Sequence, residues 1–274
     1  MTPATPPHLA FIGGGNMASA VLGGLIRQGH PIHQLTVVEP HAETRERLLA
    51  DLGLQALDHA DAALSHADVV VWAVKPQMFA VAAAQVRPFA GQALHLSVAA
   101  GIRSDSIAQW LGTERVVRAM PNTPALVGLG QAGLFARAGV PAHERQWVEY
   151  IMATTGQSLW VAHESLLDAV TAISGSGPAY VFYFIEAMVQ AATEMGLAPE
   201  QARQLAIGTF VGAAELARSS SESPATLRER VTSKGGTTHA ALQHLQAAGV
   251  AEAFRAAMQA ARERARELGD EFGA

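Results

Sequence analysis

The sequence predicts an α/β Rossmann-type domain with a parallel sheet, followed by an all-α domain. At 274 residues the chain is longer than a typical single domain. Its first part alternates short apolar runs with helical patterns, which is typical of βαβ units. Strand-like runs then stop, and helical patterns separated by Gly and Pro follow. We therefore expect one domain over residues 1–162 and a helical domain over residues 163–274.

Seven short apolar runs have the length and composition of buried strands. They cover Leu9–Ile12, Leu35–Val38 and residues 69–74, 94–98, 115–119, 134–136 and 158–161. The run at 69–74 is continuously apolar, which is typical of a central strand that is covered on both faces. Helical periodicity follows the first two runs, over residues 16–28, closed by Gly29, and over residues 42–51.

The second part contains four helical patterns. They cover residues 179–195, 199–218, 224–231 and 251–268, and the last has a charged face and an alanine-rich face. No run reaches the ~20 consecutive apolar residues that a membrane helix needs, and the first residues lack the order of a secretory signal. We therefore expect a cytoplasmic protein.

Composition disfavours several classes of function. The net charge of -5 argues against nucleic-acid partners, whose phosphates attract a basic face. The chain has no cysteine, which rules out disulfide and thiol chemistry and agrees with a reducing compartment. None of the 11 histidines stands in a metal-ligand spacing, so we expect no metal. The motifs of ATP-binding P-loops and serine-hydrolase elbows do not occur either.

A glycine-rich segment, residues 13–18, joins the first strand to the first helix. It fits the dinucleotide pattern G-x-G-x-x-A in the strand-then-helix context that the pattern requires. Gly13 permits the tight turn, Gly15 lets the backbone approach a pyrophosphate, and Ala18 allows close packing of the helix on the strand. The amides at the helix N-terminus then hold the phosphates. The segment predicts a nicotinamide dinucleotide, and a simple tight turn is the alternative.

Glu39 ends the second strand, where an acidic residue binds the adenosine ribose hydroxyls. Such a carboxylate favours NADH, because the 2′-phosphate of NADPH would meet a like charge. Arg45 and Arg47 lie along the next helix and could reach a phosphate if the loop bends. A solvated loop residue before Pro40 is the alternative interpretation of Glu39.

Two further loops follow strands at the edge where a Rossmann sheet binds its ligand. One is Val74-Lys75-Pro76, in which the proline fixes the turn, and the other begins with Asn122. We expect both loops to line the cofactor. Taken alone, each is also consistent with an ordinary turn.

A third loop, residues 231–240, opens a helix in the second part of the chain. It contains Ser233, two glycines, Thr237 and Thr238, and it offers backbone amides at a helix N-terminus. Such a group of donors suits a carboxylate. The alternative is a capped loop between helices, for which Thr237 is a good N-cap.

With these motifs in order, the chain resembles the pyrroline-5-carboxylate reductase family along nearly its whole length. The matching segments are residues 11–17, 73–76, 99–101, 120–124, 168–171, 174–180 and 231–239. The first segment is shared by many dehydrogenases. The Ser-Gly-Ser-Gly-Pro-Ala-Tyr block at 174–180 and the Gly-Gly-Thr-Thr block at 235–238 are far more specific.

The resemblance implies a reductase that acts on a small molecule and uses NADPH or NADH. It also implies that the helical domain forms a homodimer, and in some members a ring of dimers. The residues that it places at the cofactor are Gly14, Asn16, Met17, Glu39, Val74, Lys75 and Ala100; Gly13, Gly15, Pro76 and Asn122 belong to the same loops. The residues that it places at the substrate are Glu164, Thr237 and Thr238, with Ser233, Gly235 and Gly236 completing the loop. This chain departs from many relatives at Glu39, Ala60 and Arg230, and all three positions bear on cofactor preference.

The implied reaction is the reduction of Δ1-pyrroline-5-carboxylate to L-proline by hydride transfer from NAD(P)H, the last step of proline biosynthesis. A protonated iminium is a strong electrophile, so the protein mainly has to align the nicotinamide ring with the ring of the substrate. We expect Thr238 to be the catalytic residue, through a hydrogen bond to the ring nitrogen. Two alternatives remain: an enzyme for another imine or a 3-hydroxy acid, and a dinucleotide sensor without turnover. The lack of lysine in residues 179–195 counts against a hydroxy acid, and the intact substrate loop counts against a sensor.

Overall fold

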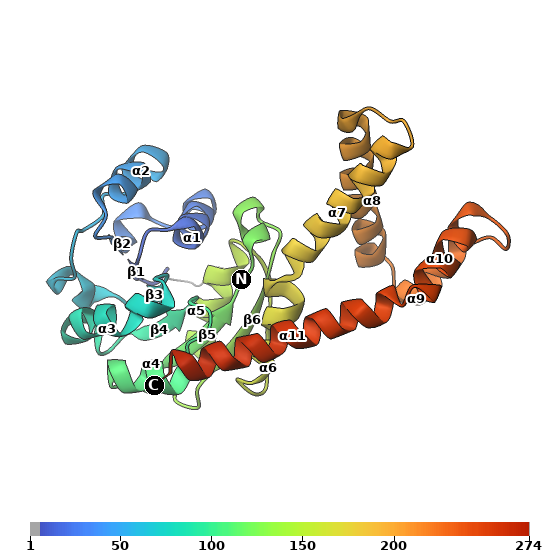
Figure 1. The fold of residues 1–274 in the computed structure, drawn as a ribbon. Coiled ribbons are helices and arrows are strands. Elements are labelled where there is room, and N and C mark those ends of the chain that lie inside the picture. The colour runs from blue at the N-terminus through green and yellow to red at the C-terminus, as the bar shows by residue number, and fades with distance from the viewer. Residues whose placement is uncertain (1–5, 274) are drawn as a thin grey trace. The chain divides into compact units, whose positions relative to one another are not determined.

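The computed structural model describes residues 6–273 and contains one seven-stranded sheet of order β2-β1-β3-β4-β5-β6-β7 (Figure 1). The strands are β1 (Leu9–Ile12), β2 (Leu35–Val38), β3 (Val69–Trp72), β4 (Leu94–Ser97), β5 (Val116–Met120), β6 (Gly130–Ala136) and β7 (Gly156–Trp160). All seven predicted strands are present. The first five are parallel, as predicted, but β6 runs antiparallel to β5. Residues 121–129 are too few for the crossover of about a dozen residues that a parallel neighbour requires.

Helices cover both faces of this sheet. They are α1 (Asn16–Arg27), α2 (Ala42–Leu52), α3 (Pro76–Ala90), α4 (Ser104–Leu111) and α5 (Ala142–Ala153), with short turns η1 (Ile32–Gln34), η2 (Ala62–His66) and η3 (Thr123–Val127). The sequence predicted α1 and α2 but not α3, α4 or α5. A proline, Pro88, lies within α3, and α4 is only 8 residues long, so neither has a clear sequence signature.

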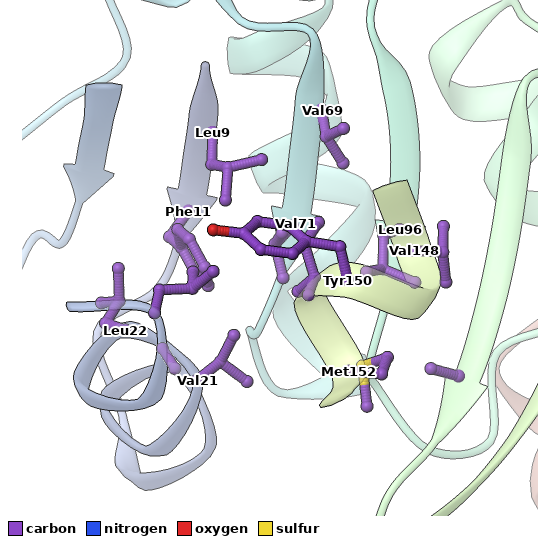
Figure 2. Close-up of a cluster of buried hydrophobic side chains, with 14 of the residues drawn as sticks. Leu9, Phe11, Val21, Leu22, Val69, Val71, Leu96, Val148, Tyr150 and Met152 are labelled. Atoms are coloured by element: carbon purple, nitrogen blue, oxygen red, sulfur yellow. The ribbon is translucent and has the colours of Figure 1, made fainter. Parts of the chain in front are cut away.

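Alternate strand residues fill two cores. Leu9, Phe11, Val69 and Val71 pack on the face that α1 and α5 cover, and Figure 2 shows them beside Tyr150. Their neighbours along the strands fill the opposite core with side chains of α3 and α4, among them Ala10, Ile12, Val70, Trp72, Phe79 and Ile107. Burial on both faces explains why these strands are continuously apolar in sequence.

The chain divides into two compact units. We call residues 1–175 with 261–274 the sheet unit, and residues 176–260 the helical unit. The change from strands to helices, near residue 162, thus lies before the point at which the units separate. Two elements lie between these points: α6 (Leu166–Val170) and the π-helical turn η4 (Thr171–Gly175). Both belong to the sheet unit, because α6 packs on β6. A Cβ at Gly133 of β6 would lie 2.8 Å from the Val170 side chain, so only glycine permits this packing.

The helical unit contains α7 (Gly177–Glu194), α8 (Pro199–Ser219), α9 (Pro224–Arg230), α10 (Thr237–Ala247) and the first part of α11 (Val250–Glu271). This confirms the four helices predicted in the second part. Tyr180 and Phe184 of α7 contact Phe254 of α11 edge to face, with ring centroids 5.6 and 5.5 Å apart. Among residues 176–260, only Ala202 and Ala206 are buried.

No helix in the described part of the chain is long and apolar enough to cross a membrane. Between residues 6 and 273, no group of three or more His, Asp or Glu side chains gathers as metal ligands.

Candidate active site

The three glycines between β1 and α1 have different surroundings. Gly13 has a φ of +95°, and a Cβ there would lie 2.6 Å from the Ala73 carbonyl oxygen of the neighbouring strand end. A Cβ at Gly14 would lie 2.6 Å from a methyl carbon of Leu48. At Gly15 an added Cβ would meet nothing within 4 Å, and no side chain caps the helix that begins at Asn16. The N-terminus of α1 is therefore open to an approaching phosphate, which fits the pyrophosphate of a dinucleotide.

Glu39 is tied to this glycine loop. The Gly14 amide donates to one carboxylate oxygen of Glu39 at 2.8 Å, and the His41 amide donates to the other at 2.9 Å. The Glu39 side chain is almost fully buried. It therefore stands where the second strand places a ribose-binding acid next to the pyrophosphate loop.

Two arginines flank Glu39 from α2. Arg45 donates to the carbonyl oxygens of Glu39 and Pro40 at 2.9 and 2.8 Å, and Arg47 donates to the Gly14 carbonyl at 3.5 Å. Both guanidinium groups are bound to the backbone rather than to the Glu39 carboxylate. The carboxylate thus remains the charge closest to the glycine loop.

The loops after β3 and β4 reach the same edge of the parallel sheet. Lys75 is exposed and precedes α3, whose first residue is Pro76. Val74 lies against the glycine loop, since a Cβ at Gly13 would be 3.3 Å from its side chain. Ala100, after β4, is exposed. These predicted cofactor residues follow neighbouring parallel strands, so they share one edge with Asn16 and Met17.

Asn122, which follows β5, is buried and makes two hydrogen bonds within the sheet unit. Its Nδ2 donates to the Ser174 carbonyl oxygen at 3.0 Å, and its Oδ1 accepts from the Gln131 amide at 2.9 Å. The side chain thus links the ends of β5, β6 and η4. The sequence pattern predicted a cofactor loop here but gave no indication of these contacts.

Glu164 has both carboxylate oxygens occupied within the sheet unit. One oxygen accepts from the Ser104 amide and from Arg118 Nη1, each at 2.6 Å, and the other accepts from the Ser104 hydroxyl at 2.6 Å. The carboxylate thereby caps the N-terminus of α4 and neutralises a buried arginine. Burial raises the pKa of the nearby Asp168 carboxyl, an effect that Arg103 and Arg118 oppose. Sequence reasoning missed Ser104 and Arg118, because they lie 60 and 46 residues away along the chain.

The threonine loop, residues 233–238, belongs to the helical unit. Gly235 has a φ of +74°, and a Cβ at Gly236 would lie 2.5 Å from the Ser233 hydroxyl oxygen. The helix α10 begins at Thr237 with Gly236 as its N-cap, so Thr237 is the first helical residue rather than the cap. No side chain caps α10, and both threonine hydroxyls lie in its first turn. This arrangement of amides and hydroxyls suits a carboxylate.

Two family models match the chain. A model described as NADP oxidoreductase coenzyme F420-dependent matches residues 8–101, and a model of pyrroline-5-carboxylate reductase dimerisation matches residues 164–268. A pyrroline-5-carboxylate reductase of Pseudomonas aeruginosa is 44% identical over 269 residues, which cover 97% of this chain and 98% of that protein. One from Pisum sativum is 34% identical over 262 residues, with 95% of each chain covered.

Solved structures of pyrroline-5-carboxylate reductases are also similar to this chain over nearly its whole length. A pyrroline-5-carboxylate reductase of Coxiella burnetii superposes with a TM-score of 0.91 at 36% identity, covering 96% of this chain and 99% of that one. A pyrroline carboxylate reductase of Plasmodium falciparum with NADP bound gives a TM-score of 0.85 at 28% identity, covering 96% and 98%.

Proposed function

This chain belongs to the pyrroline-5-carboxylate reductase family, and we propose that its glycine loop binds the dinucleotide while its threonine loop binds the substrate carboxylate. The protein is an NAD(P)H-dependent oxidoreductase that reduces Δ1-pyrroline-5-carboxylate to L-proline, the last step of proline biosynthesis. The observation that carries the cofactor assignment is the open N-terminus of α1 beside the buried carboxylate of Glu39.

We propose separate tasks for the residues of the threonine loop. The amides of Gly235 and Thr237, with the Ser233 hydroxyl, hold the carboxylate of the cyclic imine. The Gly236 amide donates to the Ser233 carbonyl oxygen at 3.0 Å and thereby shapes the loop. Thr238 donates a hydrogen bond to the ring nitrogen, which takes up a proton as the C=N bond becomes C–N. The reduced nicotinamide supplies the hydride that adds to the imine carbon. We also propose that Glu164 lies near the bound substrate. The negative charge of the Glu164 carboxylate is already balanced by Arg118.

We propose that Glu39 makes NADH the preferred cofactor. Its carboxylate oxygens are fixed by two backbone amides, so the side chain cannot leave the ribose position without losing both hydrogen bonds. A 2′-phosphate would bring like charges together at that position. The arginines that could offset this repulsion are bound to backbone carbonyls.

The test is steady-state oxidation of NADH and NADPH, measured separately with Δ1-pyrroline-5-carboxylate as acceptor. We expect turnover with both and a higher kcat/KM for NADH. Glu39→Gln should raise the NADPH to NADH ratio of kcat/KM about tenfold, equivalent to about 1.4 kcal/mol. Glu43→Gln, the same change at an exposed position of α2, should leave the ratio unchanged. An unchanged ratio in Glu39→Gln would show that another residue sets the preference.

We also propose a homodimer formed through the helical unit, in which large apolar side chains are exposed in the single chain. They are Val181, Phe182, Tyr183, Met188, Met195, Leu197, Leu205, Ile207, Val211, Leu216, Val231 and Leu245. Apolar surface of this extent is typical of an interface. The match of residues 164–268 to a dimerisation model supports this proposal. We extend this proposal to a ring of dimers and to a cytoplasmic location of the protein.

A further inference from the structure

The turn η4 is a π-helix that joins α6 to the start of α7. Its residues, Thr171–Gly175, have helical hydrogen bonding one residue wider than an α-helix. Such turns are rare and occur often at functional sites. This one lies at the end of the sheet unit, immediately before Ser176.

The sequence creates an unpaired carbonyl at this turn. In a continuous α-helix, the carbonyl of Ser174 would accept from the amide four residues on, which is Pro178. Proline has no amide hydrogen, so that donor does not exist. The amide one residue further on, that of Ala179, donates instead to the Ser176 carbonyl oxygen at 3.0 Å. The half-buried Ser174 carbonyl therefore takes its donor from elsewhere.

Asn122 supplies that donor. Its Nδ2 lies 3.0 Å from the Ser174 carbonyl oxygen, and its Oδ1 is fixed by the Gln131 amide. Its side chain is only 8% exposed, so water competes little for these bonds. The fixed Oδ1 orients the amide group and aims Nδ2 at Ser174.

Other contacts hold the same turn against the end of β5. A Cβ at Gly175 would lie 2.7 Å from the terminal methyl of Met120, which ends that strand. The hydroxyls of Ser174 and Thr171 donate to the carbonyls of Val170 and Leu167 at 3.0 and 2.8 Å. These local bonds stabilise the turn itself, whereas Asn122 alone among these polar groups ties it to the loop after β5.

We propose that Asn122 is a positioning residue for the reaction, which replaces the amide that Pro178 lacks and fixes the π-helical turn to the cofactor edge of the sheet. This inference rests on the proposed function. Hydride transfer needs reacting atoms held about 3–3.5 Å apart, so a small displacement of this turn and of the loop after β5, at the edge where we propose that the dinucleotide binds, lowers kcat. The role differs from a direct contact with the dinucleotide, because both ends of the Asn122 amide are engaged by the chain.

The experiment is a double-mutant cycle between positions 122 and 178. Asn122→Asp keeps the acceptor for Gln131 but loses the donor for Ser174, and Pro178→Ala restores a backbone amide at position 178. Each variant, the double variant and wild type are compared in kcat, in the Kd for NADH by fluorescence, and in hydrogen exchange of a peptide spanning residues 166–182. Gln131→Glu makes the same amide-to-acid change at an exposed neighbour and is the control. Tryptophan-monitored melting confirms that each variant is folded.

We expect Asn122→Asp to lower kcat about tenfold and to speed exchange, with the Kd for NADH within about twofold. Pro178→Ala should recover at least about threefold of the lost kcat and part of the exchange protection in the double variant. Weaker NADH binding with unchanged kcat, or no recovery by Pro178→Ala, would overturn the proposal. If wild-type protein does not reduce Δ1-pyrroline-5-carboxylate, the proposed function fails, and hydrogen exchange still decides whether Asn122 fixes the turn.

Discussion

The sheet unit buries apolar side chains on both faces of its sheet, whereas the helical unit buries only Ala202 and Ala206 among residues 176–260. The sheet unit therefore has the core that an independently stable domain requires. The helical unit has well-formed helices but leaves large side chains such as Phe182 and Val211 exposed. The difference indicates that the second unit completes its core with another chain.

The two units also differ in how they use charge. In the sheet unit, Glu164 and Arg118 form a largely buried pair between residues far apart in sequence. In the helical unit, the pair Arg218–Glu215 is exposed and links residues three apart on one helix. Exposed local pairs stabilise little.

All four tryptophans, at positions 72, 110, 147 and 160, belong to the sheet unit, so their fluorescence reports on that unit alone.

The largest effect should come from placing a charge on the exposed apolar face of the helical unit. Phe182→Asp and Val211→Asp, made separately, should convert the proposed homodimer to a monomer and abolish turnover. Burying each unpaired carboxylate costs about 3 kcal/mol, and a twofold interface contains each substitution twice, so the total is about 6 kcal/mol per dimer. Size-exclusion chromatography with light scattering measures the change.

The sheet unit should stay folded in these variants, so that only the helical unit is affected by the substitutions. Tryptophan fluorescence and the Kd for NADH should stay close to those of wild type in the monomeric variants. Gln259→Asp adds the same charge at an exposed position of α11, a helix with none of the exposed large apolar side chains, and serves as control. A protein that is monomeric before any substitution, yet fully active, would contradict the proposed completion by a partner.

The second effect concerns the buried pair of the sheet unit. Glu164→Ala leaves Arg118, whose side chain is 7% exposed, without its partner and removes the cap of α4. The free energy of unfolding should fall by about 3–5 kcal/mol, measured by urea denaturation followed by tryptophan fluorescence.

Two further variants separate charge from packing at this site. Replacing both partners, as Glu164→Leu with Arg118→Met, should recover part of the loss, because no unpaired buried charge remains. Glu215→Ala, which breaks an exposed pair of the helical unit, should have no measurable effect on this transition. Equal losses in the single and double variants would mean that the unpaired arginine is not the cause, and that the loss comes from the missing cap of α4.

Much of the fold followed from the sequence, because its signals were local. The apolar run at Leu9–Ile12 stands directly before three glycines, and alternate burial of strand residues follows from chain geometry. The contacts of Glu164 with Ser104 and of Asn122 with Ser174 could not be predicted, since they join residues 60 and 52 positions apart. The missing amide of Pro178 was visible in sequence, but the side chain that replaces it depends on tertiary packing.

The smallest effect we expect is a loss of sheet-unit stability in acid, through His95. This side chain is only 1% exposed, its Nδ1 accepts from the Trp72 indole at 3.1 Å, and its Nε2 is buried without a hydrogen-bond partner. Burial, and secondarily the charge of Arg115, lower the pKa of His95 to about 4. The neutral ring is therefore the form that the folded state favours.

A histidine whose pKa is lowered by folding contributes full stability above its unfolded pKa of about 6.5 and loses it as the pH falls towards 4. The loss should reach about 3 kcal/mol by pH 4. His95→Gln, which cannot titrate, should flatten the fall in unfolding free energy between pH 6.5 and 4, measured by urea denaturation with tryptophan fluorescence. His66→Gln, at an exposed position of the same unit, should leave the slope as in wild type. If His95→Gln keeps the wild-type slope, the acid sensitivity belongs to other groups, and the sheet unit does not depend on a neutral His95.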